Sequence, residues 1–159
     1  TYYYIPLEEA PYQTFHDQLN LNSTIILKKV TNISAIPANS KVIVGFHKDN
    51  STAYKPYKIS NESKKILTDL TKNHNVILNV FGSAYALRDI DISKVSTVLV
   101  SYENNEDSMI ATAKAFNGKT KIWGKLPVLV NDHLKAGMGL ELKSSSRIDL
   151  PKKIKTVIE

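Results

Sequence analysis

Polar and aromatic residues stand directly after short apolar runs, and these are the residues best suited to chemistry. The candidates for a ligand-binding or inter-domain rim are His47, Tyr85, Glu103 and Asn104. Their imidazole, carboxylate and amide groups can hydrogen-bond a polar ligand, and a tyrosine ring can stack on the face of a sugar ring. The alternative is that these loops are polar because they face water, as most loops do.

Acid/base hydrolysis by paired carboxyl groups would need two of them, about 5–5.5 Å apart in an enzyme that retains configuration. Glu103 is the one carboxylate well placed at the end of an expected strand. Glu106 and Asp107 follow closely, but we interpret them as partners of the positive start of a helix. The sequence therefore predicts no catalytic residue in this chain.

Metal and cofactor sites are not predicted either. The chain has no cysteine, which excludes disulfides, thiol nucleophiles and cysteine metal sites. Its four histidines lie far apart, without the spacing of metal ligands. Gly82-Ser83 lacks the nucleophile elbow of a serine hydrolase, and no segment matches a P-loop. Gly137-Met138-Gly139 lacks the third glycine of a dinucleotide fingerprint.

Short runs rich in β-branched residues predict the strands that would position these side chains. The runs lack strict polar alternation, which is typical of strands covered on both faces in a parallel sheet. The expected strands are 23–30, 41–46, 76–81, 97–102 and an edge strand at 126–130.

Helical spacing of apolar residues predicts helices between the strands, at 12–19, 60–73 and 106–117. Ser60 and Asn105 are expected to cap the second and third helices. Alternating strands and helices indicate right-handed crossovers. The expected fold is an α/β three-layer sandwich, flavodoxin-like, with a mostly parallel sheet of about five or six strands and helices on both faces.

The expected domain covers residues 1–142, and the composition changes after it. Ser144-Ser145-Ser146 and then Leu150-Pro151 predict that 143–159 is a linker or tail toward a following domain. The chain starts at Thr1 without an initiator Met, which we interpret as the start of an excised piece.

The net charge of +6 comes almost entirely from scattered lysines, since Arg88 and Arg147 are the only arginines. Lysines spread in this way indicate a solvated surface, not a nucleic-acid interface. No apolar run approaches the roughly 20 residues that a membrane span needs. We therefore expect neither nucleic acid nor a membrane as a partner.

Three segments, taken in order, carry a resemblance. The run 76–87, Val-Ile-Leu-Asn-Val-Phe-Gly-Ser-Ala-Tyr-Ala-Leu, resembles the strand and Phe-Gly-x-Pro-Tyr-x-Leu segment of the C-terminal domain of family 3 glycoside hydrolases. The run 98–105, Val-Leu-Val-Ser-Tyr-Glu-Asn-Asn, resembles its next strand and helix start. Gly-Lys-Leu-Pro-Val at 124–128 and Lys-Ala-Gly-Met-Gly at 135–139 resemble its ending. One departure is Ala84, where proline is common.

The resemblance implies a β-N-acetylhexosaminidase of that family, which acts on terminal β-linked N-acetylglucosamine. This group includes long forms in which a β-lactamase-like domain follows the present one. It also implies that catalysis resides on an N-terminal TIM barrel of the same polypeptide, which would contact the carbohydrate substrate. The barrel's Lys-His-Phe-Pro-Gly-His-Gly motif is absent here, so no catalytic residue is carried over to this chain. An exported or periplasmic parent protein is the expectation.

Two alternatives stay open at this point. The chain could be a non-catalytic module that binds a sugar or another small molecule at its strand ends. It could also be a purely structural scaffold between neighbouring domains.

Overall fold

The computed structural model describes residues 1–8, 10–22, 27–29, 32–49, 56–122, 124–139 and 157–158. Four strands form the body of an all-parallel sheet: β1 (Tyr2–Leu7), β3 (Lys41–His47), β4 (Asn75–Phe81) and β5 (Thr97–Val100). The short strands β2 (Leu27–Lys29) and β6 (Val157–Ile158) pair in parallel with β1 and β5 at the two edges. The spatial order is β2-β1-β3-β4-β5-β6.

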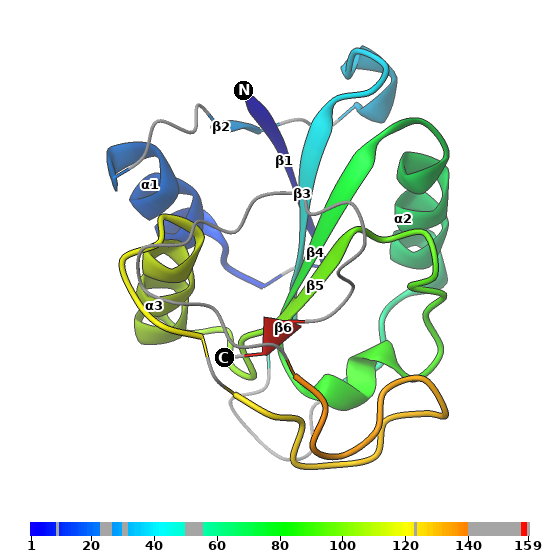
Figure 1. Ribbon diagram of the computed structural model, residues 1–159. Helices are drawn as coiled ribbons and strands as arrows, with labels where there is room; N and C mark the ends of the chain where they lie inside the picture. Colours follow the sequence, from blue (N-terminus) through cyan, green and yellow to red (C-terminus); the bar gives the residue numbers. More distant parts are fainter. Residues whose placement is uncertain are drawn as a thin grey trace.

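Helices cover both faces of this sheet, with α2 on one side and α1 and α3 on the other (Figure 1). The helix bounds are Gln13–Asn22 for α1, Asn61–Asn73 for α2 and Glu106–Phe116 for α3. The described part of the chain also contains two short 3-10 turns, η1 (Ile33–Ala35) and η2 (Ala84–Leu87). The predicted α/β fold with a parallel sheet is confirmed. Among the described residues, no helix combines the length and apolar character that crossing a bilayer requires.

Alternation along each strand divides the core into two layers, because successive side chains of a strand point to opposite faces. Val42, Val44 and Phe46 of β3 pack with Leu67 and Leu70 of α2. On the other face, a second cluster joins strand residues to the two remaining helices: Tyr4, Ile43, Ile77, Phe81, Leu99, Phe15, Leu19, Met109 and Phe116. Both faces of the strands are buried, as their unbroken apolar runs require.

The helix ends follow the sequence signals. Ser60 caps α2 by accepting a hydrogen bond from the Ser63 amide at 3.1 Å. Asn105 caps α3 in the same way, through the Ser108 amide at 2.9 Å. At the far end of α3, Gly118 adopts a φ of 68°, and the amides of Gly118 and Lys119 bond back to the carbonyls of Ala115 and Lys114. This αL closure satisfies the last carbonyl groups of the helix.

One strand expectation needs correction, and one inner strand of the sheet was not expected. The run 126–130 is not a strand, because Pro127 has no amide to donate and the segment closes on its own neighbours instead. Leu126 exchanges backbone hydrogen bonds with Met138 and Gly137, and Val130 donates to Leu134. The structure also contains a strand that was not expected, β1, and it occupies an inner position in the sheet.

The predicted tail 143–159 falls mostly outside the described residues. Only Val157 and Ile158 of that range are described, and they pair with Leu99 and Val100 of β5.

A matched pair of substitutions tests the layer between α2 and the sheet. Leu67→Ala removes a side chain that is 1% exposed, and we expect it to lower the free energy of unfolding by about 2–5 kcal/mol. Leu21→Ala makes the same chemical change on α1 at 76% exposure and should stay within about 0.5 kcal/mol of the parent. Urea unfolding followed by circular dichroism measures both; equal effects of the two substitutions would contradict this packing.

Candidate functional site

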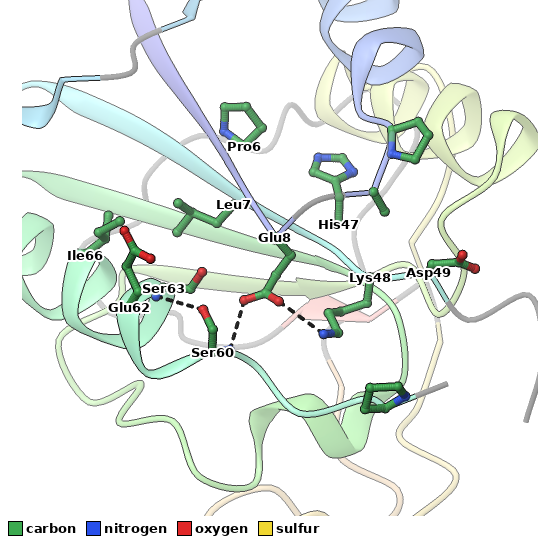
Figure 2. A pocket seen from close by; sticks show the side chains of 13 residues that line it. Pro6, Leu7, Glu8, His47, Lys48, Asp49, Ser60, Glu62, Ser63 and Ile66 are labelled. Carbon is green, nitrogen blue, oxygen red and sulfur yellow. Dashed lines mark hydrogen bonds and ion pairs between the residues drawn. The ribbon is translucent and has the colours of Figure 1, made fainter. Parts of the chain in front are cut away.

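The candidate site lies where two neighbouring strands send their connections to opposite faces of the sheet. The chain leaves β1 for α1 on one face and leaves β3 for α2 on the other, so the two loops diverge at the carboxyl ends of adjacent strands. In open α/β sheets such a switch point is the usual place for a ligand. Here it forms a pocket of about 680 Å³, shown in Figure 2 and lined by residues that include Leu7, Glu8, His47, Lys48, Ser60 and Ile66.

Glu8 lies at the centre of this pocket, one residue beyond β1. Its carboxylate accepts hydrogen bonds from the Lys48 ammonium at 3.1 Å and from the Ser60 backbone amide at 3.0 Å (Figure 2). The pair is largely shielded from solvent, with the Glu8 side chain 9% exposed and that of Lys48 16% exposed. The backbone of Glu8 has a φ of 66°, in the left-handed region that a non-glycine residue rarely adopts. Its contacts with β3 and α2 hold it in this conformation.

Opposing influences set the pKa of Glu8, and the net result is a lowered pKa. Burial is the largest influence and raises the pKa, because it penalises the charged carboxylate. Hydrogen bonds from the Ser60 amide, the Ser63 and Ser60 hydroxyls and the Lys48 ammonium together outweigh burial and favour the ionised form. Glu8 is therefore an anion at neutral pH and is poorly suited to act as a general acid.

His47 ends β3 beside the pocket and is fully buried. Its ring stacks on Phe81, with centroids 4.5 Å apart and planes inclined by 13°. The Nδ1 atom lies 2.7 Å from Oδ1 of Asn104, and Nε2 is hydrogen-bonded to the Tyr4 hydroxyl. Asn104 in turn donates from Nδ2 to the carbonyl of Pro11 at 2.9 Å. One chain of hydrogen bonds thus links β1, β3 and the loops that precede α1 and α3.

The direction of these hydrogen bonds fixes the state of His47. Because the amide nitrogen of Asn104 donates to Pro11, its oxygen faces His47 and needs a donor, so Nδ1 carries the proton. Nε2 is then an acceptor for the Tyr4 hydroxyl in a neutral ring. Burial lowers the pKa of His47 to about 4, although the hydrogen bond to Asn104 raises it in part. Burial also raises the pKa of the Tyr4 phenol, which therefore stays protonated as the donor.

Gly45 makes room for this arrangement. A Cβ atom at Gly45 would lie 2.5 Å from the Tyr4 hydroxyl and 2.6 Å from Nε2 of His47, closer than non-bonded atoms approach. The glycine within an otherwise β-branched strand is thus explained by the hydrogen bond that passes beside it.

The structure brings two of the four predicted rim residues together. His47 and Asn104 are hydrogen-bonded, but His47 is 0% exposed and serves the interior of the protein. Glu103 is exposed and accepts a hydrogen bond from the Asn105 side chain. Tyr85 lies apart from them on η2, where its ring contacts Tyr57 and the Arg88 guanidinium.

Sequence reasoning missed Glu8, Lys48, Ser60 and Ser63 as a group. Ser60 was recognised as a cap, but its link to Glu8 spans 52 positions and leaves no local pattern. The one available signal was the aromatic and β-branched run Tyr3-Tyr4-Ile5, which favours a strand and would have placed Glu8 at its carboxyl end.

Within the described part of the chain, no group of three or more histidine, aspartate or glutamate residues could hold a metal ion. Comparisons with protein-family models, with curated proteins and with solved structures found no match to this chain.

The buried imidazole predicts a pH dependence of stability. Its pKa is about 4 in the folded protein against about 6.5 in the unfolded chain, so the unfolded state binds more protons between these values. Stability should be full above pH 6.5 and fall by about 3 kcal/mol as the pH drops from 6.5 to 4. The lowered pKa of Glu8 affects stability at lower pH. The stabilisation that its ionised carboxylate contributes is lost only as the pH falls below the ordinary pKa of a glutamate.

Urea unfolding at a series of pH values measures this dependence. His47→Gln should flatten the profile between pH 6.5 and 4, whereas His133→Gln, which changes an exposed residue, should leave the slope unchanged. A parent profile that is flat in this window would contradict a neutral buried His47.

A second substitution tests the space beside the Tyr4–His47 hydrogen bond. Gly45→Ala should lower the free energy of unfolding by about 1–3 kcal/mol, because the added methyl group displaces two buried rings. Gly82→Ala is the matched control: its Cβ would meet Lys48 Cβ at 3.2 Å, and the loss should stay below about 1 kcal/mol. Equal losses in chemical unfolding would show that the Tyr4–His47 contact does not constrain position 45.

Proposed function

We propose that this chain is a non-catalytic accessory α/β domain of a family 3 glycoside hydrolase of the β-N-acetylhexosaminidase class. In this proposal the parent enzyme removes terminal β-linked N-acetylglucosamine, and its TIM-barrel domain, on the same polypeptide, supplies the catalytic residues. The present domain would pack on the barrel and shape one side of the active-site region.

The observation that carries the proposal is the spatial meeting of the three segments behind the resemblance. The segments 76–87 and 98–105 are neighbours through the β4–β5 pairing. Leu126 of the third segment belongs to the same core cluster as Ala84 and Leu87, and Val128 packs against that cluster. Just outside these segments, Arg88 donates to the Val130 carbonyl at 3.4 Å. Segments far apart in sequence thus form one structural unit, which is what a shared ancestral domain would preserve.

The strand order gives further support. The order β2-β1-β3-β4-β5 corresponds to the 2-1-3-4-5 arrangement of flavodoxin-like folds. Together with the helices on both faces, this order supports the three-layer sandwich that the resemblance implies. The short β6 adds to the same parallel sheet beside β5.

The chemistry of the pocket favours an accessory role over an independent enzyme. A glycosidase acid has a raised pKa, but the pKa of Glu8 is lowered by its hydrogen bonds. His47 is neutral and enclosed, with both ring nitrogens engaged. Neither group is available to exchange protons with a substrate.

The two other candidate functions each have one supporting observation. The strand-end pocket favours a module that binds a small molecule or sugar. Leu129, 58% exposed, and Met138, 40% exposed, lie on the described segment 124–139 and favour a structural scaffold, since such residues suit an interface with another domain.

The accessory role predicts that the purified chain does not hydrolyse an aryl β-N-acetylglucosaminide above the uncatalysed rate. A complete family 3 enzyme, assayed beside it, serves as the positive control. The coding sequence that precedes Thr1 should specify a TIM barrel with the Lys-His-Phe-Pro-Gly-His-Gly motif. Turnover by the pure chain would refute the accessory role, and an upstream sequence without a barrel would refute the family assignment.

A further inference from the structure

We propose that the pocket at the ends of β1 and β3 selects uncharged polyhydroxyl ligands, that is saccharides, and rejects anions. This inference rests on the second of the candidate functions, the binding module, and is independent of the resemblance to glycoside hydrolases. The pocket of about 680 Å³ is large enough for a small saccharide, and its lining combines charged, hydroxyl and apolar groups.

Anion binding at this place is blocked by the chain's own side chains. In α/β folds a phosphate commonly sits at the start of a helix beside the switch point, on free backbone amides. Here the Ser60 amide donates to the Glu8 carboxylate at 3.0 Å, and the Ser63 amide donates to the Ser60 hydroxyl at 3.1 Å. Glu8 thus occupies with its own negative charge the position that a phosphate would take.

The charge of the lining points the same way. Among the described residues that line the pocket, Glu8 and Glu62 contribute carboxylates against the ammonium of Lys48, since His47 is neutral. The Lys48 ammonium is itself paired with Glu8. A chain with a net charge of +6 therefore presents a locally negative pocket, which repels phosphate and carboxylate groups.

The same groups suit a sugar. A hydroxyl group both donates and accepts, so one diol can donate to the Glu8 carboxylate and accept from the Lys48 ammonium. The Ser60 and Ser63 hydroxyls lie beside this pair (Figure 2). Leu7 and Ile66 provide apolar surface for the C–H face of a sugar ring.

The walls of the pocket are held before any ligand arrives. The Ala10 amide donates to the carbonyl of His47 at 3.3 Å, and the Lys48 amide donates to that of Phe81 at 3.0 Å. The Asn104–Pro11 hydrogen bond secures the loop before α1. A preformed site loses less conformational entropy on binding than a mobile one.

The test measures binding to the full chain by calorimetry and by thermal shift at pH 7. The panel holds two neutral sugars (glucose and N-acetylglucosamine), one amine (glucosamine), and two anions (inorganic phosphate and N-acetylglucosamine 6-phosphate). We expect saturable binding of at least one neutral sugar and at least tenfold weaker binding of its phosphate ester. The proposed selectivity is overturned if either anion binds more tightly than the neutral sugars, or if the amine binds at least tenfold more tightly than they do. Either result would still support a binding module. Absence of binding by the whole panel overturns both.

A substitution locates the site. Glu8→Gln keeps the shape of the side chain but removes its charge, and should weaken sugar binding about tenfold. Glu106→Gln makes the same change on the exposed start of α3, outside the pocket, and should leave the affinity unchanged. If Glu8→Gln does not fold, Glu62→Gln at the exposed rim of the pocket should admit phosphate more readily than the parent does. Sugar binding unchanged by Glu8→Gln, or phosphate binding unchanged by Glu62→Gln, overturns the proposal.

Discussion

The carboxyl edge of this sheet depends on a neutral imidazole buried at the end of β3. His47 accepts from the Tyr4 hydroxyl through one nitrogen and donates to Asn104 through the other, so that neither buried nitrogen lacks a partner. The chain continues from Asn104 to the Pro11 carbonyl. The positions of β1, β3 and the two flanking loops are thereby set by a single directional series of hydrogen bonds. A charged ring would reverse the polarity required at Nε2 and would be expensive to enclose.

The second constraint acts on the α2 side of the same strand ends. Glu8 adopts a left-handed backbone conformation and joins β1 to the start of α2 through the Ser60 amide, and to β3 through Lys48. Strained conformations of this kind persist where surrounding contacts over-determine them, and they gather at functional sites. Tyr102, just beyond β5, shares the conformation with a φ of 61°. Two of the three described non-glycine residues with a positive φ thus lie at the edge of the sheet that carries the pocket, and the third, Asn39, precedes β3 at the opposite edge.

Much of the fold could be predicted from the sequence, because its signals are local. Ser60 and Asn105 cap helices through amides three positions away, and Gly118 closes α3 within its own last turn. The prediction of a strand at 126–130 was wrong because an apolar composition does not show which partners the backbone groups hydrogen-bond. The pocket could not be predicted in this way, since its central contacts join residues 40 and 52 positions apart. His47 and Asn104 were selected as strand-end residues, but their separation of 57 positions concealed that they bond to each other.

The inner position of β1 has a consequence for anyone who prepares shorter versions of this protein. Residues 2–7 look like a leader that could be trimmed, yet β1 lies between β2 and β3 and gives β2 its pairing. Trimming them would remove an inner strand of the sheet and leave β2 without the strand it pairs with. It would also remove Tyr4 and the segment that leads to Glu8. Truncation boundaries and affinity tags therefore need to leave the first residues of the chain intact, because they form an inner strand of the sheet.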